Sequence, residues 1–298
     1  MCIRDRSDAD DLDLGTDGQL YVTTGRAALP RSPLLRAVRP DGTIAWTRHG
    51  VVRAAAGPSG HVFTVASAGT GHVVTLFDAA GNTSWEHPLP DAQVVATVST
   101  DRSEFSVYGQ GASGHVSNDS GLWVFSVQGL VAGPTRLARP VLNDGSLIDT
   151  GHMFAYRYGS TLVAVSRSGN PLWETPVSDR VGPGLLAAAD DGTLFINGRN
   201  GVFASFSASG ALRWSVAPRD FGMSHGMWPP RVTTRPGLVT LATLDRGLYL
   251  FDAQGVLTWR YSQSRDSGEP FLGATALYLD GMFYAARRDH VFAFAPRP

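Results

Sequence analysis

The stretch SGALRW, residues 209–214, shows the pattern that decides the fold of this 298-residue chain. A glycine stands four residues before a tryptophan, and the same arrangement recurs in DGTIAW (41–46), AGNTSW (80–85), SGNPLW (168–173) and QGVLTW (254–259). A sixth copy, QGLVAG (128–133), has a glycine at position 133 where tryptophan is expected. Neighbouring copies are 39 to 48 residues apart. The chain is therefore built from repeats of one supersecondary unit.

A second series of glycines lies between the members of the first. It comprises DGQLYV (17–22), SGHVFT (59–64), TGHMFA (150–155), DGTLFI (191–196), PGLVTL (236–241) and DGMFYA (280–285), with a degenerate member near Arg102. In one unit, residues 186–217, alternating apolar and polar residues predict four short strands, and the Asp-Gly and Ser-Gly pairs predict tight hairpin turns. No segment combines a sustained helical period with capping residues, so almost no helix is expected.

Four-stranded units with a period of about 43 residues predict an all-β protein with a β-propeller fold. The two glycine series predict seven four-stranded blades in a single propeller domain, residues 8–298. The last unit, residues 264–298, has three predicted strands and no Gly-x-x-x-Trp strand, so a strand from the other terminus is expected to complete the ring. An eighth blade in the full-length protein is the alternative.

The composition narrows the range of partners. Charged residues make up 17% of the chain, all 25 basic residues are arginine, and the net charge is −1. This gives no indication of a nucleic-acid partner, and no apolar run is long enough to span a membrane.

The first seven residues, MCIRDRS, resemble translated sequencing-adaptor DNA and are expected to be non-native. The native N-terminus and any signal peptide are then expected upstream. The only cysteine, Cys2, lies in this segment, so neither disulfides nor thiolate metal sites are predicted. No cofactor is expected.

Two stretches, LYLFDAQGVLTW (248–259) and VVTLFDAAGNTSW (73–85), resemble the repeats of PQQ-type, or quinoprotein-like, β-propellers. Repeats of that family pair a strand ending in aspartate with a glycine turn and a tryptophan, and Asp252 and Asp78 match the aspartate. The resemblance runs from about residue 11 to the C-terminus. The family includes envelope lipoproteins that help assemble outer-membrane proteins, sensor modules of larger chains, and quinone-dependent dehydrogenases.

The repeated tryptophans are predicted to tie the ring together. Each lies in a predicted outermost strand and is expected to reach toward the neighbouring blade: Trp46, Trp85, Trp173, Trp214 and Trp259. Burying one indole removes about 150–250 Å² from water, which contributes at most about 4–6 kcal/mol. We therefore expect a structural role at the blade junctions, in preference to direct ligand binding.

Function is expected on the face that carries the second-to-third-strand loops and the blade connections, because the opposite face holds only tight glycine turns. Three second-to-third segments are long, namely 25–34, 66–72 and 109–121, and both neutral insertion and a binding wall explain them. The candidate binding residues are Arg180, Arg219, His225, Trp228, Arg246, Arg265 and Arg288.

Two details of this face keep alternatives open. Arginine–aspartate neighbours recur there, and they fit either ion pairs between blades or an arginine-lined mouth that takes a carboxylate or peptide. His225 stands between two methionines, a soft-metal pattern, yet packing is the expected role and no metal site is predicted. No recognised catalytic motif is found.

These features favour a non-catalytic, monomeric propeller that binds a protein or peptide on the long-loop face. The expected location is extracytoplasmic in the bacterial cell envelope, whether periplasmic, lipoprotein-anchored or secreted. The alternatives are a PQQ-dependent dehydrogenase, a sensor module of a larger protein, or a hydrolase or lyase on the same fold. Dehydrogenases of the family carry an adjacent cysteine pair and a Ca²⁺ site of acidic and asparagine side chains, and neither is evident here.

Overall fold

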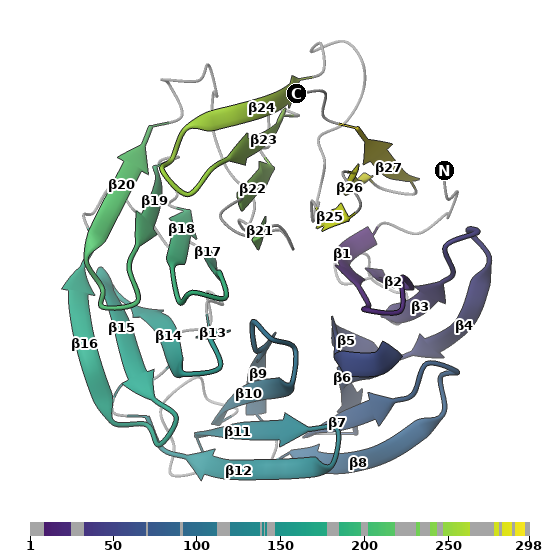
Figure 1. The fold of residues 1–298 in the computed structure, drawn as a ribbon. Coiled ribbons are helices and arrows are strands. Elements are labelled where there is room, and N and C mark those ends of the chain that lie inside the picture. Colours follow the sequence, from purple (N-terminus) through teal and green to yellow (C-terminus); the bar gives the residue numbers. More distant parts are fainter. Residues whose placement is uncertain are drawn as a thin grey trace.

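The strands form a ring of β-sheets around a central axis (Figure 1). The computed structural model describes residues 9–24, 33–69, 71–89, 92–111, 120–137, 139, 141, 147–177, 185–197, 202–217, 231–232, 239–242, 247–262, 277–279, 282–287 and 290–295. In these residues the only helical element is the 3₁₀ turn η1 (Pro58–Gly60), and no helix of membrane-spanning length and hydrophobicity occurs. The predicted all-β propeller is confirmed.

The first three blades are complete four-stranded antiparallel sheets. Blade 1 contains β1 (Ala9–Leu14), β2 (Leu20–Thr24), β3 (Leu34–Val38) and β4 (Ile44–His49). Blade 2 contains β5 (Val51–Ala56), β6 (Val62–Ala68), β7 (Gly71–Phe77) and β8 (Thr83–Leu89). Blade 3 contains β9 (Ala92–Val98), β10 (Glu104–Gly111), β11 (Gly121–Ser126) and β12 (Gly129–Thr135).

The next three blades repeat this plan and the last departs from it. Blade 4 contains β13 (Leu147–Asp149), β14 (Met153–Tyr158), β15 (Thr161–Ser166) and β16 (Pro171–Pro176). Blade 5 contains β17 (Leu185–Ala188), β18 (Leu194–Asn197), β19 (Phe203–Phe206) and β20 (Leu212–Val216). Blade 6 contains β21 (Arg231–Val232), β22 (Val239–Ala242), β23 (Gly247–Phe251) and β24 (Leu257–Ser262). In blade 7 the described residues form three strands, β25 (Leu277–Leu279), β26 (Met282–Arg287) and β27 (His290–Phe294).

The described strands therefore form seven sheets, six of four strands and one of three, as the glycine series predict. In each blade the chain runs outward as a meander, so the first strand lies nearest the axis and the fourth lies at the rim (Figure 1). The inner strands β1, β5, β9, β13, β17 and β21 contact one another in sequence, and β1 also lies against β26 of blade 7. The first and last blades therefore meet at a seam.

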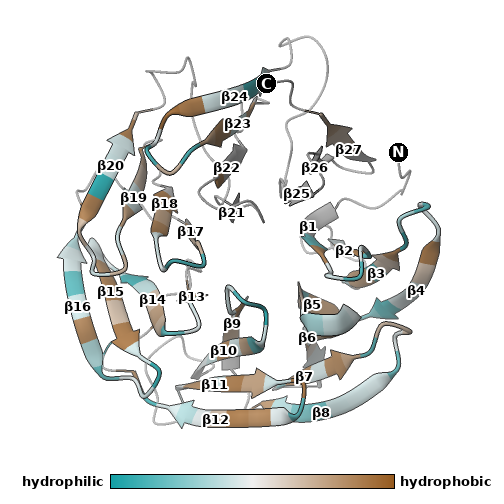
Figure 2. Cartoon of the chain, in the orientation of Figure 1, coloured by the Kyte–Doolittle hydropathy of each residue, from teal (hydrophilic) through white to brown (hydrophobic). Residues whose placement is uncertain are grey.

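The hydrophobic core lies between blades, mainly on the second and third strands. The third strands β7, β11 and β15 are rich in apolar residues (Figure 2), and each has at least four consecutive buried positions. Outer strands alternate exposed and half-buried residues instead, as in β8 and β16. This is the pattern of strands that face a neighbouring blade on one side and solvent on the other.

Each outer strand with a tryptophan starts with the same irregularity. The pairing register between the third and fourth strands shifts by one residue just before the tryptophan in blades 1, 2, 4, 5 and 6. In blade 6, for example, Phe251 pairs with Leu257 and Leu250 pairs with Trp259. Such a bulge re-aims the following side chain, so the repeat specifies where the indole points as well as where the chain turns.

A short side chain caps the turn before this bulge. In blade 2 the carboxylate of Asp78 accepts hydrogen bonds from the backbone N–H of Asn82 at 2.8 Å and from its side-chain amide at 3.1 Å. Ser166 and Ser207 accept the equivalent backbone bond in blades 4 and 5, each at 3.1 Å. These side chains replace backbone hydrogen bonds that a tight turn leaves unmade.

Candidate functional site

Four of the repeated tryptophans contact the next blade in the ring through the same type of hydrogen bond. The indole N–H donates to a backbone carbonyl two residues before the next blade's turn glycine. The four described pairs are Trp46 to Ala79 at 3.0 Å, Trp85 to Val127 at 3.1 Å, Trp173 to Ala208 at 2.9 Å and Trp214 to Ala253 at 2.9 Å. The indole faces a turn that the neighbouring blade presents, so each contact spans one blade junction.

The turn glycine leaves room for the indole because it has no side chain. A Cβ added to Gly81 would lie 2.7 Å from Trp46, one added to Gly210 would lie 2.6 Å from Trp173, and one at Gly255 would lie 2.6 Å from Trp214. The same glycines have φ between 81° and 85°, which side chains disfavour. At these three junctions the glycine that opens the outer strand is therefore required both by its own turn and by the indole of the preceding blade.

Blade 3 lacks its tryptophan and joins blade 4 differently. Gly169 of blade 4 is contacted by Thr135 and by the carbonyl of Arg136, which follow β12, so backbone and a methyl group take the place of the indole. Beyond them, the guanidinium of Arg139 binds Glu174 of blade 4 at 3.0 Å. This explains how the sixth copy of the repeat functions with Gly133 in place of tryptophan.

The seven predicted loop-face residues lie outside the described part of the chain: Arg180, Arg219, His225, Trp228, Arg246, Arg265 and Arg288. Their role in binding stays a prediction. One of the three long segments predicted on that face, 66–72, was expected to form an extended loop. In the structure β6 continues to Ala68 and β7 starts at Gly71, and these two residues pair with each other. The extra residues lengthen a hairpin instead of forming a loop.

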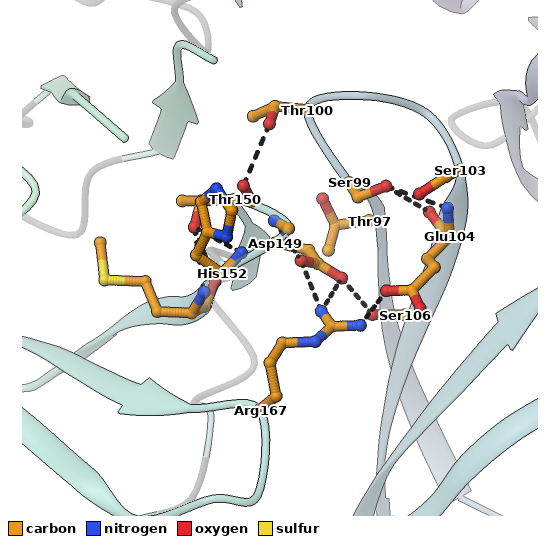
Figure 3. Close-up of polar contacts among 12 residues, drawn as sticks. Thr97, Ser99, Thr100, Ser103, Glu104, Ser106, Asp149, Thr150, His152 and Arg167 are labelled. Atoms are coloured by element: carbon orange, nitrogen blue, oxygen red, sulfur yellow. Dashed lines mark hydrogen bonds and ion pairs between the residues drawn. The ribbon is translucent and has the colours of Figure 1, made fainter. Parts of the chain in front are cut away.

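The densest polar cluster lies on the opposite face, where blades 3 and 4 meet near the axis (Figure 3). The Asp149 carboxylate is fully buried at the end of β13. It accepts hydrogen bonds from Arg167 at 2.7 Å to each oxygen, from the Ser106 hydroxyl at 2.6 Å and from the backbone N–H of Gly151 at 2.8 Å. A buried carboxylate with this many donors is stable only as part of such a network.

Glu104 extends this cluster across the junction. The second guanidinium nitrogen of Arg167 pairs with Glu104, which begins β10 of blade 3. Burial raises the pKa of Glu104 above its usual range; Arg167 lowers it, and the charges of Asp149 and Asp101 raise it further. Two carboxylates thus share one guanidinium, and Arg167 also stacks over the ring of Phe154 at 4.6 Å.

A second ionic contact links blades 1, 2 and 3 on the same face. Arg102 of blade 3 donates to the carbonyl of Leu14 at 2.7 Å and to the Asp13 carboxylate at 3.0 Å. Asp13 in turn accepts the backbone N–H of Ala56 in blade 2 at 2.8 Å. Arg102 has φ of 62° at a position where Gly18, Gly60, Gly151 and Gly192 have φ of 75–80°. Arg102, the degenerate member of the glycine series, is therefore the residue through which blades 1, 2 and 3 are linked.

Neither cluster is predicted as a site by the sequence. Arg102 stands out there only as an exception in the glycine series, and an arginine at a position that favours glycine is the signal that could have revealed it. Within the described residues, no group of three His, Cys, Asp or Glu side chains is placed to hold a metal ion. The clusters are satisfied internally by hydrogen bonds between blades, and this arrangement joins the blades to one another.

Comparison with known proteins agrees with this geometry. Residues 159–297 match the family model for outer membrane protein assembly factor BamB, a PQQ-type repeat model. The repeats within residues 159–297 are similar to those of this PQQ-type model. No curated protein sequence matches the chain significantly.

Solved structures support the same fold. BamB from Moraxella catarrhalis is 16% identical, with a TM-score of 0.56 over 95% of this chain and 81% of that chain. Hsv2 from Kluyveromyces lactis, with its complete loop 6CD, is 10% identical, with a TM-score of 0.60 over 94% of this chain and 90% of that chain. At such identities the similarity shows the propeller architecture alone. In this propeller the tryptophan of one blade and the turn glycine of the next act together at the junctions of blades 1 and 2, 4 and 5, and 5 and 6.

Proposed function

We propose that this protein is a non-catalytic, monomeric binding scaffold of the bacterial cell envelope, with a protein or peptide as its partner. The observation that carries the proposal is the match of residues 159–297 to the model of an outer membrane protein assembly factor. In the proposed role, the propeller presents a rigid surface to other polypeptides. The fold by itself does not assign this role.

The distribution of contacts favours the long-loop face as the binding surface. On the turn face, three glycine turns lie under the indoles of neighbouring blades. Arg102, Asp149 and Arg167 bond within the ring. Polar groups that are already satisfied offer little to a partner. The arginines Arg180, Arg219 and Arg246 belong to the opposite face in the predicted topology, where guanidinium groups can bind carboxylates in two-point contacts.

Site-specific photocrosslinking in envelope preparations tests the proposal. A photoreactive residue at Trp228 is expected to form a discrete protein adduct, and the same residue at His152, which is exposed on the turn face, is expected to form none. Adducts from His152 alone would place the partner on the wrong face. Absence of adducts from both positions, in a preparation where the protein is folded, would contradict the scaffold role.

Neither the cysteine content of the chain nor its described residues fit the quinone cofactor that the family name suggests. The chain has a single cysteine, and the described residues hold no acidic cluster placed for Ca²⁺. Addition of PQQ with Ca²⁺ is expected to leave tryptophan fluorescence unchanged. Saturable quenching together with dye-linked alcohol oxidation would replace the scaffold role with a dehydrogenase role.

The location is tested separately from the binding. Reading the genomic coding sequence upstream of residue 8 is expected to show an export signal. A start codon directly before the first blade, with no export signal between them, would contradict the envelope location. The binding role would then be judged on the crosslinking result.

A further inference from the structure

Arg139 lies in the connection between β12 and β13, at the blade junction that has no tryptophan. Before and after it in the sequence, Leu137 and Val141 are buried in the hydrophobic cluster between blades 3 and 4. The carbonyl of Arg139 accepts a hydrogen bond from the Tyr156 hydroxyl at 3.1 Å. The backbone at Arg139 is therefore fixed against blade 4, while its side chain remains 42% exposed.

Two contacts hold the guanidinium of Arg139 in one orientation. Its Nε atom lies 3.0 Å from one carboxylate oxygen of Glu174, and its Nη2 atom donates to the other oxygen at 3.0 Å. Its Cζ atom lies 5.1 Å from the centroid of the Tyr158 ring. A two-point ion pair and an aromatic face both restrict the side chain. A partner that binds this guanidinium therefore has little further ordering to impose on it.

The ion pair with Glu174 uses only one edge of the guanidinium. Arginine presents N–H donors along two edges of a planar fork. The remaining nitrogen of Arg139, Nη1, has no hydrogen-bond partner among the described residues, and it is not one of the buried unpaired polar atoms. The edge formed by Nη1 and Nη2 is therefore open to a second carboxylate, which it can bind through two parallel hydrogen bonds.

The axial end of the same junction shows a guanidinium with both carboxylates in place. Arg167 donates through Nη1 to Asp149 and through Nη2 to Glu104, so two carboxylates share one arginine (Figure 3). Asp149 belongs to blade 4 and Glu104 to blade 3. Arg139 has the carboxylate of blade 4 and none from blade 3 among the described residues.

We propose that Arg139 is the anchor for a carboxylate of the partner polypeptide, which binds the Nη1–Nη2 edge while Glu174 keeps the Nε edge. This inference rests on the proposed scaffold role and names the chemistry that the partner presents, namely an acidic side chain or a C-terminal carboxylate. Glu174 also limits what binds, because its negative charge opposes a group with a double charge more strongly than a single carboxylate.

Short peptides added to the full chain test this chemistry without the native partner. The probes are acetyl-Gly-Gly-Gly with a free C-terminal carboxylate, acetyl-Gly-Asp-Gly-amide, and the uncharged acetyl-Gly-Asn-Gly-amide. Binding is located by the nitrogen-15 NMR signal of the Arg139 Nε–H group, which is assigned by its loss in Arg139→Gln. We expect a saturable shift with a carboxylate peptide and none with the asparagine peptide. The stronger of the two carboxylate peptides identifies the source of the carboxylate, and no saturable shift with either would overturn the proposal.

Two variants separate an anchor from a simple tie between blades. Arg139→Gln and Glu174→Gln break the same ion pair, so a purely structural pair predicts equal effects on peptide affinity, measured by ligand-observed NMR. Arg139→Gln is expected to weaken binding by at least about tenfold. Glu174→Gln keeps the guanidinium and removes a neighbouring negative charge, so its binding is expected to be equal or tighter. Equal weakening in the two variants would contradict the anchor.

A second arginine controls for the loss of surface charge. Arg213 is 45% exposed and also pairs with a carboxylate, that of Asp191 at 3.8 Å. Arg213→Gln is expected to leave peptide affinity unchanged, and weakening equal to that of Arg139→Gln would mean that the peptides respond to net charge alone. If Arg139→Gln does not fold, the Arg139 signal of the unaltered protein tests the same contact.

The native partner separates this inference from the scaffold role. Formation of the photocrosslinked adduct at Trp228 is expected to fall at least about tenfold in Arg139→Gln and to persist in Arg213→Gln. An adduct unaffected by Arg139→Gln would overturn the anchor and leave the scaffold role in place. Absence of the adduct in the unaltered protein would contradict the scaffold role, and the peptide titration would then decide whether Arg139 binds carboxylates.

Discussion

At the residue scale, single side chains join blades that are far apart in sequence. Trp214 is half-buried, yet it donates to Ala253 at 2.9 Å and packs on the rings of Phe203 and Phe251. Gly255 lies directly under its indole. The stability of each junction therefore depends on a residue pair that belongs to two different repeats.

Replacing Trp214 with alanine is expected to destabilise the protein by about 3 kcal/mol, since it removes aromatic packing and exposes a junction. Urea unfolding followed by circular dichroism measures the loss. Leu212→Ala on the same strand is the control, because Leu212 is 58% exposed, and its effect is expected to stay within about 0.5 kcal/mol. Similar losses in the two variants would mean that the indole does not tie the blades.

Arg102 combines a cost in backbone conformation with a gain in contacts. Its positive φ costs about 1 kcal/mol relative to glycine, so Arg102→Gly is expected to be more stable than Arg102→Ala by about that amount. Both variants lose the contacts with Leu14 and Asp13, and both are expected to be less stable than the unaltered protein. Unfolding free energies of the three proteins test the order, and an Arg102→Gly protein more stable than the parent would show that the contacts of Arg102 contribute less than its positive φ costs.

Glu104 makes the stability of the ring depend on pH. Its folded-state pKa is raised, first by burial, so the stability associated with its protonated form is present below the ordinary glutamate pKa and is lost as pH rises through the folded value. Glu104→Gln is therefore expected to gain stability relative to the parent as pH rises from about 4 to about 7. Unfolding at several pH values measures this, with exposed Glu86→Gln as control, and a difference independent of pH would refute it.

At the element scale, the outer strand β12 shows that the repeat tolerates a different junction. Every residue from Leu130 to Pro134 is exposed, and the pairing of β12 with β11 is irregular at two places, unlike the single bulge of the other outer strands. A Cβ added to Gly133 would lie 2.7 Å from the carbonyl of Leu122 and 2.8 Å from the Cα of Trp123. The strand has adapted to a glycine at the tryptophan position.

Restoring the repeat consensus in this strand is expected to harm the protein. Gly133→Trp places a side chain on a residue with φ of 125°. The Cβ of that side chain would lie too close to the backbone of the neighbouring strand β11. A loss of at least about 2 kcal/mol is expected from strain and overpacking, measured by thermal unfolding. Val131→Trp, at a 53% exposed site on the same strand, is the control for adding an indole. A stabilised Gly133→Trp protein would show that blade 3 lost its tryptophan without compensation.

At the scale of the whole molecule, the ring is unevenly supported. Blades 1 to 4 are joined by the contacts of Arg102, Asp149 and Arg167 in addition to tryptophans. Blade 7 has three strands in the described part of the chain and meets blade 1 where β26 lies against β1. The ring is expected to open first at this three-stranded sheet, because local stability follows the amount of buried, hydrogen-bonded structure.

Hydrogen–deuterium exchange of the protein alone measures this asymmetry. Amides of β27 are expected to exchange faster than those of β15, which lies between two paired strands in blade 4. Uniform protection around the ring would mean that the seam is as stable as the complete junctions.

Much of this architecture follows from the sequence by itself. The glycine that needs a positive φ and the tryptophan four residues later are local and repeated, so their spacing predicts the strands, the turns and the seven blades. Blade 3 could not be predicted from Gly133, because its junction depends on Thr135 and Arg136 approaching Gly169 from a different repeat.

Only the tertiary structure decided which polar residues meet. Arg102 and Asp13 are 89 positions apart in sequence, and Arg167 and Glu104 are 63 apart. Their contacts exist because ring closure brings the ends of different blades together near one axis. A periodic sequence determines the shape of each blade through local backbone preferences and burial. The partners of charged side chains at the axis are set by the angle between blades, which the packing of the whole ring determines.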